Sequence, residues 1–551
     1  MPKQSGVTDA HDPGAGARAS AAAATSIPAR PPGRRLAHST AIFSVATGIS
    51  RVLGLLRESV SAYFFGTQGQ INAFTVAFQI PNLVRALVAD AALSGAFVPV
   101  FSELLEKGDR KRAWRVASTL FWLMLLALGG LTALFMLLAP YVLRLFGDPG
   151  GNLDLAVGLS RVLFPTVVLL GLSGIVVGIL NSYDHFTVPA LSPVFWNLAI
   201  IVGLVLGVPN QDTESAKLYV YAGSIVVGTL IQFLLPLPWL RGLDGRLRLV
   251  IDWRDPAVKR FFVLLLPVTV GLGLINVNAV IDTLFASRLI DPLLAPAAID
   301  KAFRLYMLPQ GMFSVAVATV LFPALSRLAA RRDDPGFRDT VGLGVRQIGF
   351  LLIPAGVISA VLAEPIVRIV YQRGEFTADQ TTVVAGALAA FSLGLVFNGW
   401  MLLLNRAFFS RQSNWVPTLV AVLNLALNVV LDLVFYRVGV WGIPLATSLV
   451  NMAGAAALAY ALRRRMGRLG LATIGNSVAR VLVASGCAAG VAYGVWWALD
   501  DVLGRSFAAQ FVSLGSALLS AGAVYVVVCW LLRVAELNAV LGLLRRPRTE
   551  S

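Results

Sequence analysis

The stretch SRVLGLLRESVSAYFFG, residues 50–66, places charged side chains inside an apolar helical run. Composition decides which solvent surrounds it: 57% of the 551 residues are hydrophobic, 13% are charged, and the mean hydropathy is +0.76. A soluble chain of this length would expose far more charge. The sequence therefore predicts an all-α integral membrane protein, in which Arg51, Arg57 and Glu58 need a reason to lie at membrane depth.

Apolar segments that can cross a bilayer, which takes about 20 residues each, recur along the whole chain and predict about fourteen transmembrane helices. The first residues are rich in Ala, Pro and Gly without hydrophobic periodicity, which is typical of a disordered tail. The predicted parts are an N-terminal tail (1–37), two helical regions (38–240 and 258–462), a C-terminal helix pair (475–533) and a basic C-terminal tail (534–551).

Lys and Arg gather in alternate loops, around residues 107–115, 241–260, 327–338 and 463–468, while the intervening loops carry almost none. By the positive-inside rule, these basic loops and both termini are predicted to be cytoplasmic. The net charge of +16 is mostly this topological signal. Nucleic-acid binding is not expected, because the basic residues are dispersed and lack interleaved aromatic residues.

Catalytic and nucleotide-binding motifs are not found in the sequence, and no metal-ligand spacing occurs around its two cysteines or three histidines. The chain is therefore predicted not to be an enzyme. Any transport must then draw on an ion gradient, the membrane potential or the gradient of the substrate itself.

An arginine at the bilayer centre costs roughly 2.5–3.5 kcal/mol on insertion scales. Two local explanations exist for residues 50–66: the arginines snorkel, or Arg51 pairs with Glu58 two helical turns away. However, Arg85 lies within a second predicted helix, and Arg304 lies just ahead of a proline in a third. Four such arginines would cost on the order of 10 kcal/mol if each were buried alone. They are expected to line one water-filled cavity, and a cavity with excess positive charge favours an anionic ligand.

Six segments resemble the MurJ (MviN) lipid II flippases of the multidrug/oligosaccharidyl-lipid/polysaccharide exporter superfamily: SRVLGLLRE, AFTVAFQIPNLVRALVADAALSGAFVPVF, GILNSYDHFTVPALSPVFWN, RLYMLPQGMFSVAVATVLFPALS, QRGEFTADQT and NRAFFSRQSNWVPT. The resemblance runs from about residue 38 to 535. It implies a fourteen-helix fold of two pseudo-symmetric six-helix lobes, with two C-terminal helices forming a groove for a polyprenyl tail. It also implies the substrate lipid II, an undecaprenyl-diphosphate-linked disaccharide-pentapeptide, flipped to the outer leaflet of the bacterial cytoplasmic membrane for cell-wall synthesis.

The resemblance implies a substrate-binding set consisting of Arg51, Arg57, Glu58, Arg85, Asp90 and Arg304. The chemistry agrees, because a diphosphate carries about two negative charges and arginine offers a forked, always-protonated donor. The chain departs from many family members at three positions. Asn72, Ala86 and Asp90 stand where those members have an aspartate, an arginine and a glutamate, which puts a gating role of position 72 in doubt.

A cation site is also predicted. Asp282 lies within one predicted span. One face of another span carries Asn424, Asn428 and Asp432, four residues apart. Together these carboxylate and amide side chains offer the oxygen ligands that small cations prefer. The alternative is that Asp432 is hydrated at the membrane edge and the amides bond neighbouring helices. The resemblance implies a sodium site in the second lobe, to which Thr447 would contribute; no other cofactor is expected.

Other functions remain open. A flippase for another undecaprenyl-diphosphate-linked glycan needs the same cationic residues. A drug–cation antiporter of the same superfamily would be expected to have about twelve spans and an acidic cavity, and a non-transporting scaffold would tolerate loss of the arginines. An enzyme acting on lipid diphosphates is disfavoured, because clustered catalytic groups are missing. The expected partners are lipid II, membrane lipids and, as protein candidates, cell-wall synthesis proteins.

Overall fold

The computed structural model describes residues 33–87, 96–413, 415–467 and 470–537, and all regular structure in these ranges is helical. Ten of the described helices are long and apolar enough to cross a membrane, or eleven if the bent pair Ala378–Leu393 and Leu395–Ser410 forms one span. The all-α membrane class predicted from composition is confirmed. Asp90 of the predicted site lies outside the described residues.

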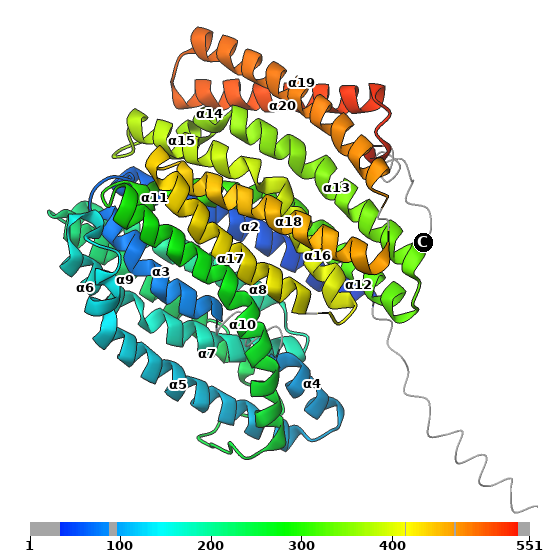
Figure 1. Cartoon of the computed structure of the whole chain (residues 1–551). Coiled ribbons are helices and arrows are strands. Elements are labelled where there is room, and N and C mark those ends of the chain that lie inside the picture. The colour runs from blue at the N-terminus through cyan, green and yellow to red at the C-terminus, as the bar shows by residue number, and fades with distance from the viewer. Residues whose placement is uncertain (1–32, 88–95, 414, 468–469, 538–551) are drawn as a thin grey trace, which may run out of the picture.

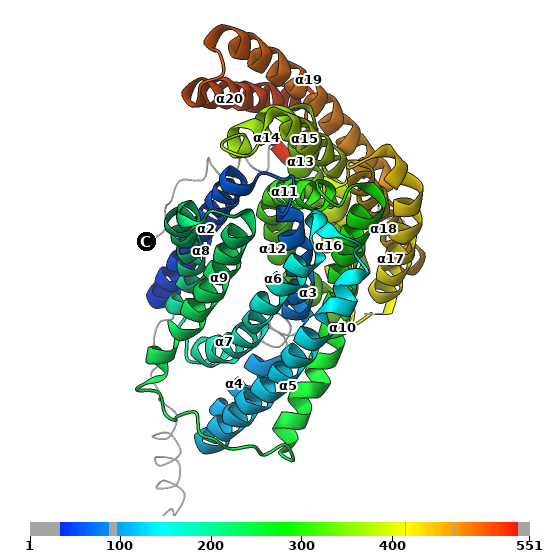
Figure 2. The same ribbon diagram turned by 90° about the vertical axis from the view of Figure 1, so that its left-hand side faces the viewer.

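The described residues of the first half form eight α-helices: α2 (Gly33–Phe65), α3 (Ile71–Arg85), α4 (Val98–Glu106), α5 (Arg110–Arg144), α6 (Leu153–Leu163), α7 (Pro165–Ser182), α8 (Thr187–Gly207) and α9 (Glu214–Leu234). Side chains of Asp109, Asn152 and Thr213 accept hydrogen bonds from the first turns of α5, α6 and α9, which explains where these helices begin. Figure 2 shows α8 side by side with α9 and with α2.

The second half forms α10 (Pro256–Phe285), α11 (Ala295–Pro309), α12 (Val315–Ala330), α13 (Asp334–Val361), α14 (Ala363–Tyr371), α15 (Ala378–Leu393), α16 (Leu395–Ser410), α17 (Trp415–Phe435) and α18 (Gly442–Met466). A π-helical turn, Gln310–Ser314, separates α11 from α12 directly after Pro309. Such widened turns are frequent at functional sites. The proline therefore marks a break in this span.

The last helices, α19 (Leu471–Leu503) and α20 (Phe507–Leu531), lie together along one side of the bundle, next to α13 (Figure 1). Small side chains line their contact, including Ala484 and Ala488 of α19 and Ala517 and Ala521 of α20. Residues of this size let helix backbones approach closely in a membrane. The Tyr525 hydroxyl donates a 2.6 Å hydrogen bond to the Phe350 carbonyl, which fastens α20 to α13.

Buried apolar side chains form two larger clusters besides that of α19 and α20. The first is built mainly from α3 to α9, and the second from α11 to α18. Helix α10 crosses between them, because Ala257, Val258 and Phe261 at its start belong to the first cluster while its later part packs on α17. The end of α2 also contacts both, with Phe65 in the first cluster and Ala62 in the second.

At the end of the bundle where α10 begins, an arginine fork joins two helix starts. Arg112 of α5 donates from Nε and Nη2 to the two carboxylate oxygens of Asp255, at 3.0 and 2.9 Å. Asp255 also accepts from the Ala257 amide and so caps α10. The hydrogen bonds from Arg112 lower the pKa of Asp255 below its ordinary value.

At the opposite end, short polar contacts join α2 and the following loop to the loop before α15. The Thr67 amide donates to Gln380 Oε1 at 2.8 Å, and the Glu375 amide donates to the Tyr63 carbonyl at 2.9 Å. Gly374 has a φ of +59°, and a Cβ there would lie within van der Waals overlap of the Tyr63 backbone. The turn at Gly374 therefore also sets the distance between the two halves.

Gly374→Ala is expected to destabilise the protein more than Gly504→Ala. Both glycines have positive φ, so an alanine costs about 1–2 kcal/mol of backbone strain at either position. Only position 374 adds a steric clash, worth about 1–3 kcal/mol, because nothing lies within 4 Å of a Cβ at 504. Thermal unfolding of both purified variants measures the difference. Equal melting temperatures would contradict the close approach at Tyr63.

Candidate functional site

A cavity of about 380 Å³ lies between helices of the first half and α11 of the second. It has six charged lining residues, which come from α2, α3 and α11: Arg57, Glu58, Arg85, Asp300, Lys301 and Arg304. Three of the arginines predicted to bind substrate therefore share one cavity. Four cationic side chains face two carboxylates, which leaves an excess of two positive charges in the lining.

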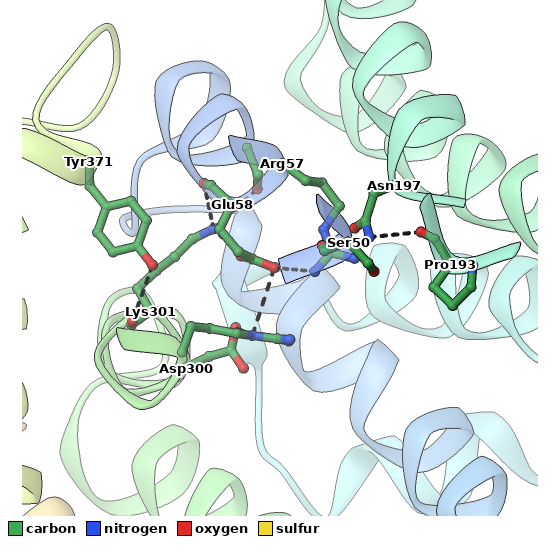
Figure 3. A network of polar contacts seen from close by, with 10 residues as sticks. Ser50, Arg57, Glu58, Pro193, Asn197, Asp300, Lys301 and Tyr371 are labelled. Carbon is green, nitrogen blue, oxygen red and sulfur yellow. Dashed lines mark hydrogen bonds and ion pairs between the residues drawn. The ribbon is translucent and has the colours of Figure 1, made fainter. Parts of the chain in front are cut away.

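Glu58 is the centre of this charged group and is only 6% exposed. Its Oε2 accepts a 2.8 Å hydrogen bond from Lys301 Nζ, and its Oε1 accepts one of 2.5 Å from Arg57 Nη2 (Figure 3). Arg304 Nε lies 3.8 Å from the same Oε1. A buried charge needs such partners, because removing it from water costs several kcal/mol.

The three arginines are held in different ways. Arg57 stacks its guanidinium over the Trp196 ring at 4.6 Å, and its buried Nε has no hydrogen-bond partner among the described residues. Arg85 donates from Nε and Nη2 to Asn82 Oδ1 at 3.2 and 2.9 Å. Arg304 donates from Nε to Asp300 Oδ2 at 3.3 Å and keeps 36% of its side chain exposed. Arg57 through its Nε, and Arg304 through its partly exposed side chain, keep donor groups that an anion could take.

Arg51 does not line this cavity. Its side chain is exposed and donates from Nη2 to the Gly311 carbonyl at 3.3 Å, in the π-helical turn after α11. The sequence-based alternative in which Arg51 pairs with Glu58 is wrong, because Glu58 bonds to Lys301 and Arg57 instead. Seven residues bring Arg51 to the same helical face as Glu58, but the two turns between them keep the head groups apart.

Sequence reasoning missed Asp300 and Lys301. Their spacing from Arg304 in IDKAFR could have identified them, because residues three and four positions apart share one helix face and would face the same cavity as Arg304. Asp300 pairs with Arg304 one turn along α11, and Lys301 crosses to Glu58 on α2. These charges were overlooked because they lie at the start of a predicted span, where ionised residues are common.

A second cavity of about 350 Å³ lies on the other side of α11 and is lined by many amides; its polar lining includes Asn278, Asp282, Gln310, Asn398, Asn405, Asn424, Thr447 and Asn451. Beside it, Asn428 and Asp432 of α17 are fully buried. With its amide turned to suit its neighbours, Asn428 donates to Asn278 Oδ1 and Asp282 Oδ1, both at 2.8 Å, and to Asp432 Oδ2 at 3.1 Å. The predicted oxygen ligands Asp282, Asn428 and Asp432 are thus brought together.

This cluster holds more acceptor oxygens than protons. An amide nitrogen has two N–H donors, whereas Asn428 faces three oxygens. Asp432 Oδ1 is buried without a hydrogen-bond partner among the described residues. Within that part of the chain no group of three or more His, Cys, Asp or Glu residues gathers, so two carboxylates with amide oxygens are the donor set. Hard oxygen donors of this kind suit a small cation.

Asn72 closes the wall of the first cavity. It is fully buried, and its Nδ2 lies 2.5, 3.0 and 3.1 Å from the carbonyls of Leu293, Thr67 and Gly69. Its Oδ1 accepts a 2.9 Å hydrogen bond from the amide of Ala297, a residue of the cavity lining. Leu293 and Ala297 belong to the second half, so one side chain both donates and accepts across the contact.

Asn72→Asp is expected to lower the melting temperature at pH 7.5 by several degrees and by less at pH 5. A carboxylate has no donor for the three carbonyls, and an unsatisfied buried group costs about 1–3 kcal/mol. Protonation at low pH restores one donor, so the loss shrinks as the pH falls.

The matched control is Asn210→Asp, because Asn210 is exposed and donates to a single carbonyl, that of Leu206. Thermal unfolding of both variants at the two pH values is the measurement. An Asn72→Asp protein as stable as the control at pH 7.5 would show that the amide donors do not hold the halves together.

Comparison with known proteins gives a consistent result. The family model described as "Lipid II flippase MurJ" matches residues 61–513. The chain is 34% identical over 443 residues to a protein of Vibrio cholerae named "Probable lipid II flippase MurJ", covering 76% of this chain and 82% of that protein. It is 32% identical over 385 residues to "Lipid II flippase MurJ" of Burkholderia cenocepacia, covering 68% and 73%.

Solved structures show the same fold. "Lipid II flippase MurJ, inward closed conformation" superposes with a TM-score of 0.72 at 23% identity, covering 88% of this chain and 97% of that one. An inward-facing multidrug resistance MATE family transporter of the MOP superfamily gives a TM-score of 0.59 at 16% identity, covering 78% and 94%.

Proposed function

The chain belongs to the MurJ family of lipid II flippases, and on that basis we propose that it moves lipid II from the inner to the outer leaflet of the bacterial cytoplasmic membrane. The movement is alternating access, in which the two halves of the chain rock against each other around the central cavity. The family consists of transporters, so the cavity is proposed to bind and release its ligand without changing it chemically.

The observation that carries this proposal is the excess of two positive charges in the first cavity. A diphosphate linking a polyprenyl chain to a sugar carries about two negative charges, which the arginines can receive through forked hydrogen bonds. We propose that Arg57, Arg85 and Arg304 hold the diphosphate and Glu58 orders them. In the same proposal, Arg51, which contacts the π-helical turn, lies on the path to this site, and Asp90 belongs to the substrate-binding set.

The membrane potential supplies a direction. With the cytoplasm negative, outward movement of two negative charges is favoured by roughly 4–5 kcal/mol per 100 mV. In the same proposal the basic loops and both termini lie on the cytoplasmic side, as the positive-inside rule predicts. The Tyr63–Gly374 contact then closes the outer end, so the cavity opens toward the leaflet that supplies the lipid.

The proposed topology has fourteen spans. The eleven helical spans recognised by length and hydropathy leave out α2, α10 and the segment from α3 to α4. Helix α2 is not among the spans recognised by hydropathy, because Arg51, Arg57 and Glu58 interrupt its apolar run. Counting these three segments gives two six-helix lobes over 38–240 and 258–462, with α19 and α20 as a groove for the lipid tail.

Arg57→Ala, Arg85→Ala and Arg304→Ala are each expected to abolish growth when the variant replaces the host flippase, while the protein stays in the membrane. The lysine variants should recover part of the function, because they keep the charge and lose the fork. Arg437→Ala is the control, since Arg437 lies in an exposed turn after α17. Growth on Arg304→Ala equal to wild type would refute the assignment.

A direct transport test decides the substrate. Purified protein in vesicles is given lipid II or a different undecaprenyl-diphosphate-linked glycan, and the fraction reaching the opposite leaflet is measured. Transport of lipid II is the expected outcome. Movement of the other glycan alone would contradict the proposal and favour the rival flippase.

We further propose that Asp282, Asn428, Asp432 and Thr447 hold a sodium ion. The surplus of acceptor oxygens around Asn428 supports it, and Thr447 lines the same cavity as Asp282. Sodium entering down its gradient would bind there after lipid release and return the emptied cavity to the inward-open state. No other cofactor is proposed.

Sodium is expected to raise the melting temperature of the wild-type protein above its value in choline chloride, because a ligand that binds only the folded state stabilises it. Asp432→Asn should lose this difference, and Asp501→Asn, at an exposed position on α19, should keep it. Vesicle transport with and without a sodium gradient gives the second readout. An unchanged sodium effect in Asp432→Asn would place the ion elsewhere or nowhere.

A further inference from the structure

Lys301 lines the first cavity, yet all its donors are already used. Its side chain is 6% exposed and reaches three acceptors on α2: Glu58 Oε2 at 2.8 Å, the Glu58 carbonyl at 3.3 Å and Ser61 Oγ at 3.3 Å. A lysine ammonium has three N–H donors. Tyr371 adds a hydrogen bond from its hydroxyl to the Lys301 carbonyl, at 3.3 Å. Lys301 is therefore fixed on Glu58 and has no donor left for a ligand.

The two carboxylate oxygens of Glu58 have different partners. Oε2 belongs to Lys301, whereas Oε1 is the oxygen that Arg57 contacts at 2.5 Å and Arg304 approaches at 3.8 Å. Two guanidinium groups that converge on one anionic oxygen form the arrangement a phosphate oxygen would need. Figure 3 shows Glu58 between Lys301 and Arg57.

A bound diphosphate must therefore compete with Glu58 Oε1. If Glu58 depended on the arginines alone, their departure would leave a buried carboxylate without a partner, which costs several kcal/mol. The arginines would then stay on Glu58 and the anion would bind weakly. A second cation on Oε2 removes this obstacle, because the carboxylate stays neutralised after the arginines have left.

We propose that Lys301 is a positioning residue for anion binding, which retains Glu58 through Oε2 so that Arg57 and Arg304 can pass from Oε1 to the diphosphate. In the empty cavity Glu58 Oε1 holds the place of a phosphate oxygen for Arg57, while Arg304 is shared between Glu58 and Asp300. This inference rests on the proposed function. It adds a role for Lys301 that differs both from direct phosphate binding and from simple support of the fold.

A double-mutant cycle on the purified full-length protein tests the inference, with lipid II and inorganic pyrophosphate as probes. Lys301→Met should weaken binding of both by about tenfold or more, because Glu58 then retains the arginines. Glu58→Gln/Lys301→Met should recover most of this loss, since the competing carboxylate is gone. Lys301→Gln is neutral but can still donate to Glu58, so it should fold and show the weakened binding even if Lys301→Met does not fold.

Two other roles of Lys301 predict different binding and stability results for these variants. If Lys301 itself bound phosphate, the double variant would bind as weakly as Lys301→Met, and the inference would be overturned. If Lys301 only supported the fold, its variants would lower the melting temperature without changing the dissociation constant per folded molecule, which would also overturn it. Lys107→Met is the control, because Lys107 pairs with Glu103 at an exposed position. This variant should bind both probes as the wild type does.

The wild-type protein separates this inference from the proposed function. Failure of the wild type to bind either probe contradicts the proposed function, and the role of Lys301 falls with it. Binding by the wild type without recovery in the double variant overturns the role of Lys301 alone and leaves the flippase proposal intact.

Discussion

A carboxylate buried at membrane depth cannot remain without a cation, and this constraint on Glu58 organises the centre of the protein. Its partners come from two places: Arg57 from its own helix, α2, and Lys301 and Arg304 from α11, more than 240 residues along the chain. The same requirement that pairs the charges therefore joins the two halves. Apolar packing alone would not fix this contact, because apolar helix surfaces gain little from one another in a lipid solvent.

Helix α11 is the wall between the two cavities. Asp300, Lys301 and Arg304 face the first, while Phe303, Tyr306, Met307 and Gln310 face the second. The offsets of three and four residues within each set place them on two separate helix faces. Any displacement of α11 changes both cavities together, so anion binding on one side and cation binding on the other have a physical route by which to influence each other.

Much of this could be read from the sequence, for stated physical reasons. Hydropathy determines the all-helical membrane class, and the cost of isolated charges predicts that all four arginines line one cavity. The structure places Arg57, Arg85 and Arg304 there and leaves Arg51 outside it. Their role in substrate binding stays a prediction. Side-chain direction could not be read in the same way. Helical spacing put Arg51 on the face of Glu58, but its head group reaches Gly311. Nor does local sequence reveal that Lys301 crosses to α2, because that pairing depends on how distant helices pack.

The contacts that join helices at the start of α10 and those around Asn72 are of different kinds. Where α5 and α10 begin, Arg112 pairs with Asp255 and Arg260 pairs with Glu103, both as ion pairs. At the other end, the amide of Asn72, the side chain of Gln380 and backbone groups make contacts between neutral partners. Dissolved ions screen exposed charge pairs over about 10 Å at 0.1 M ionic strength and leave neutral hydrogen bonds almost untouched. The salt content of the surrounding medium therefore weakens the ion pairs at Asp255 and Glu103 and leaves the contacts of Asn72 almost unchanged. A bacterium facing osmotic change would thus keep the Asn72 closure at constant strength.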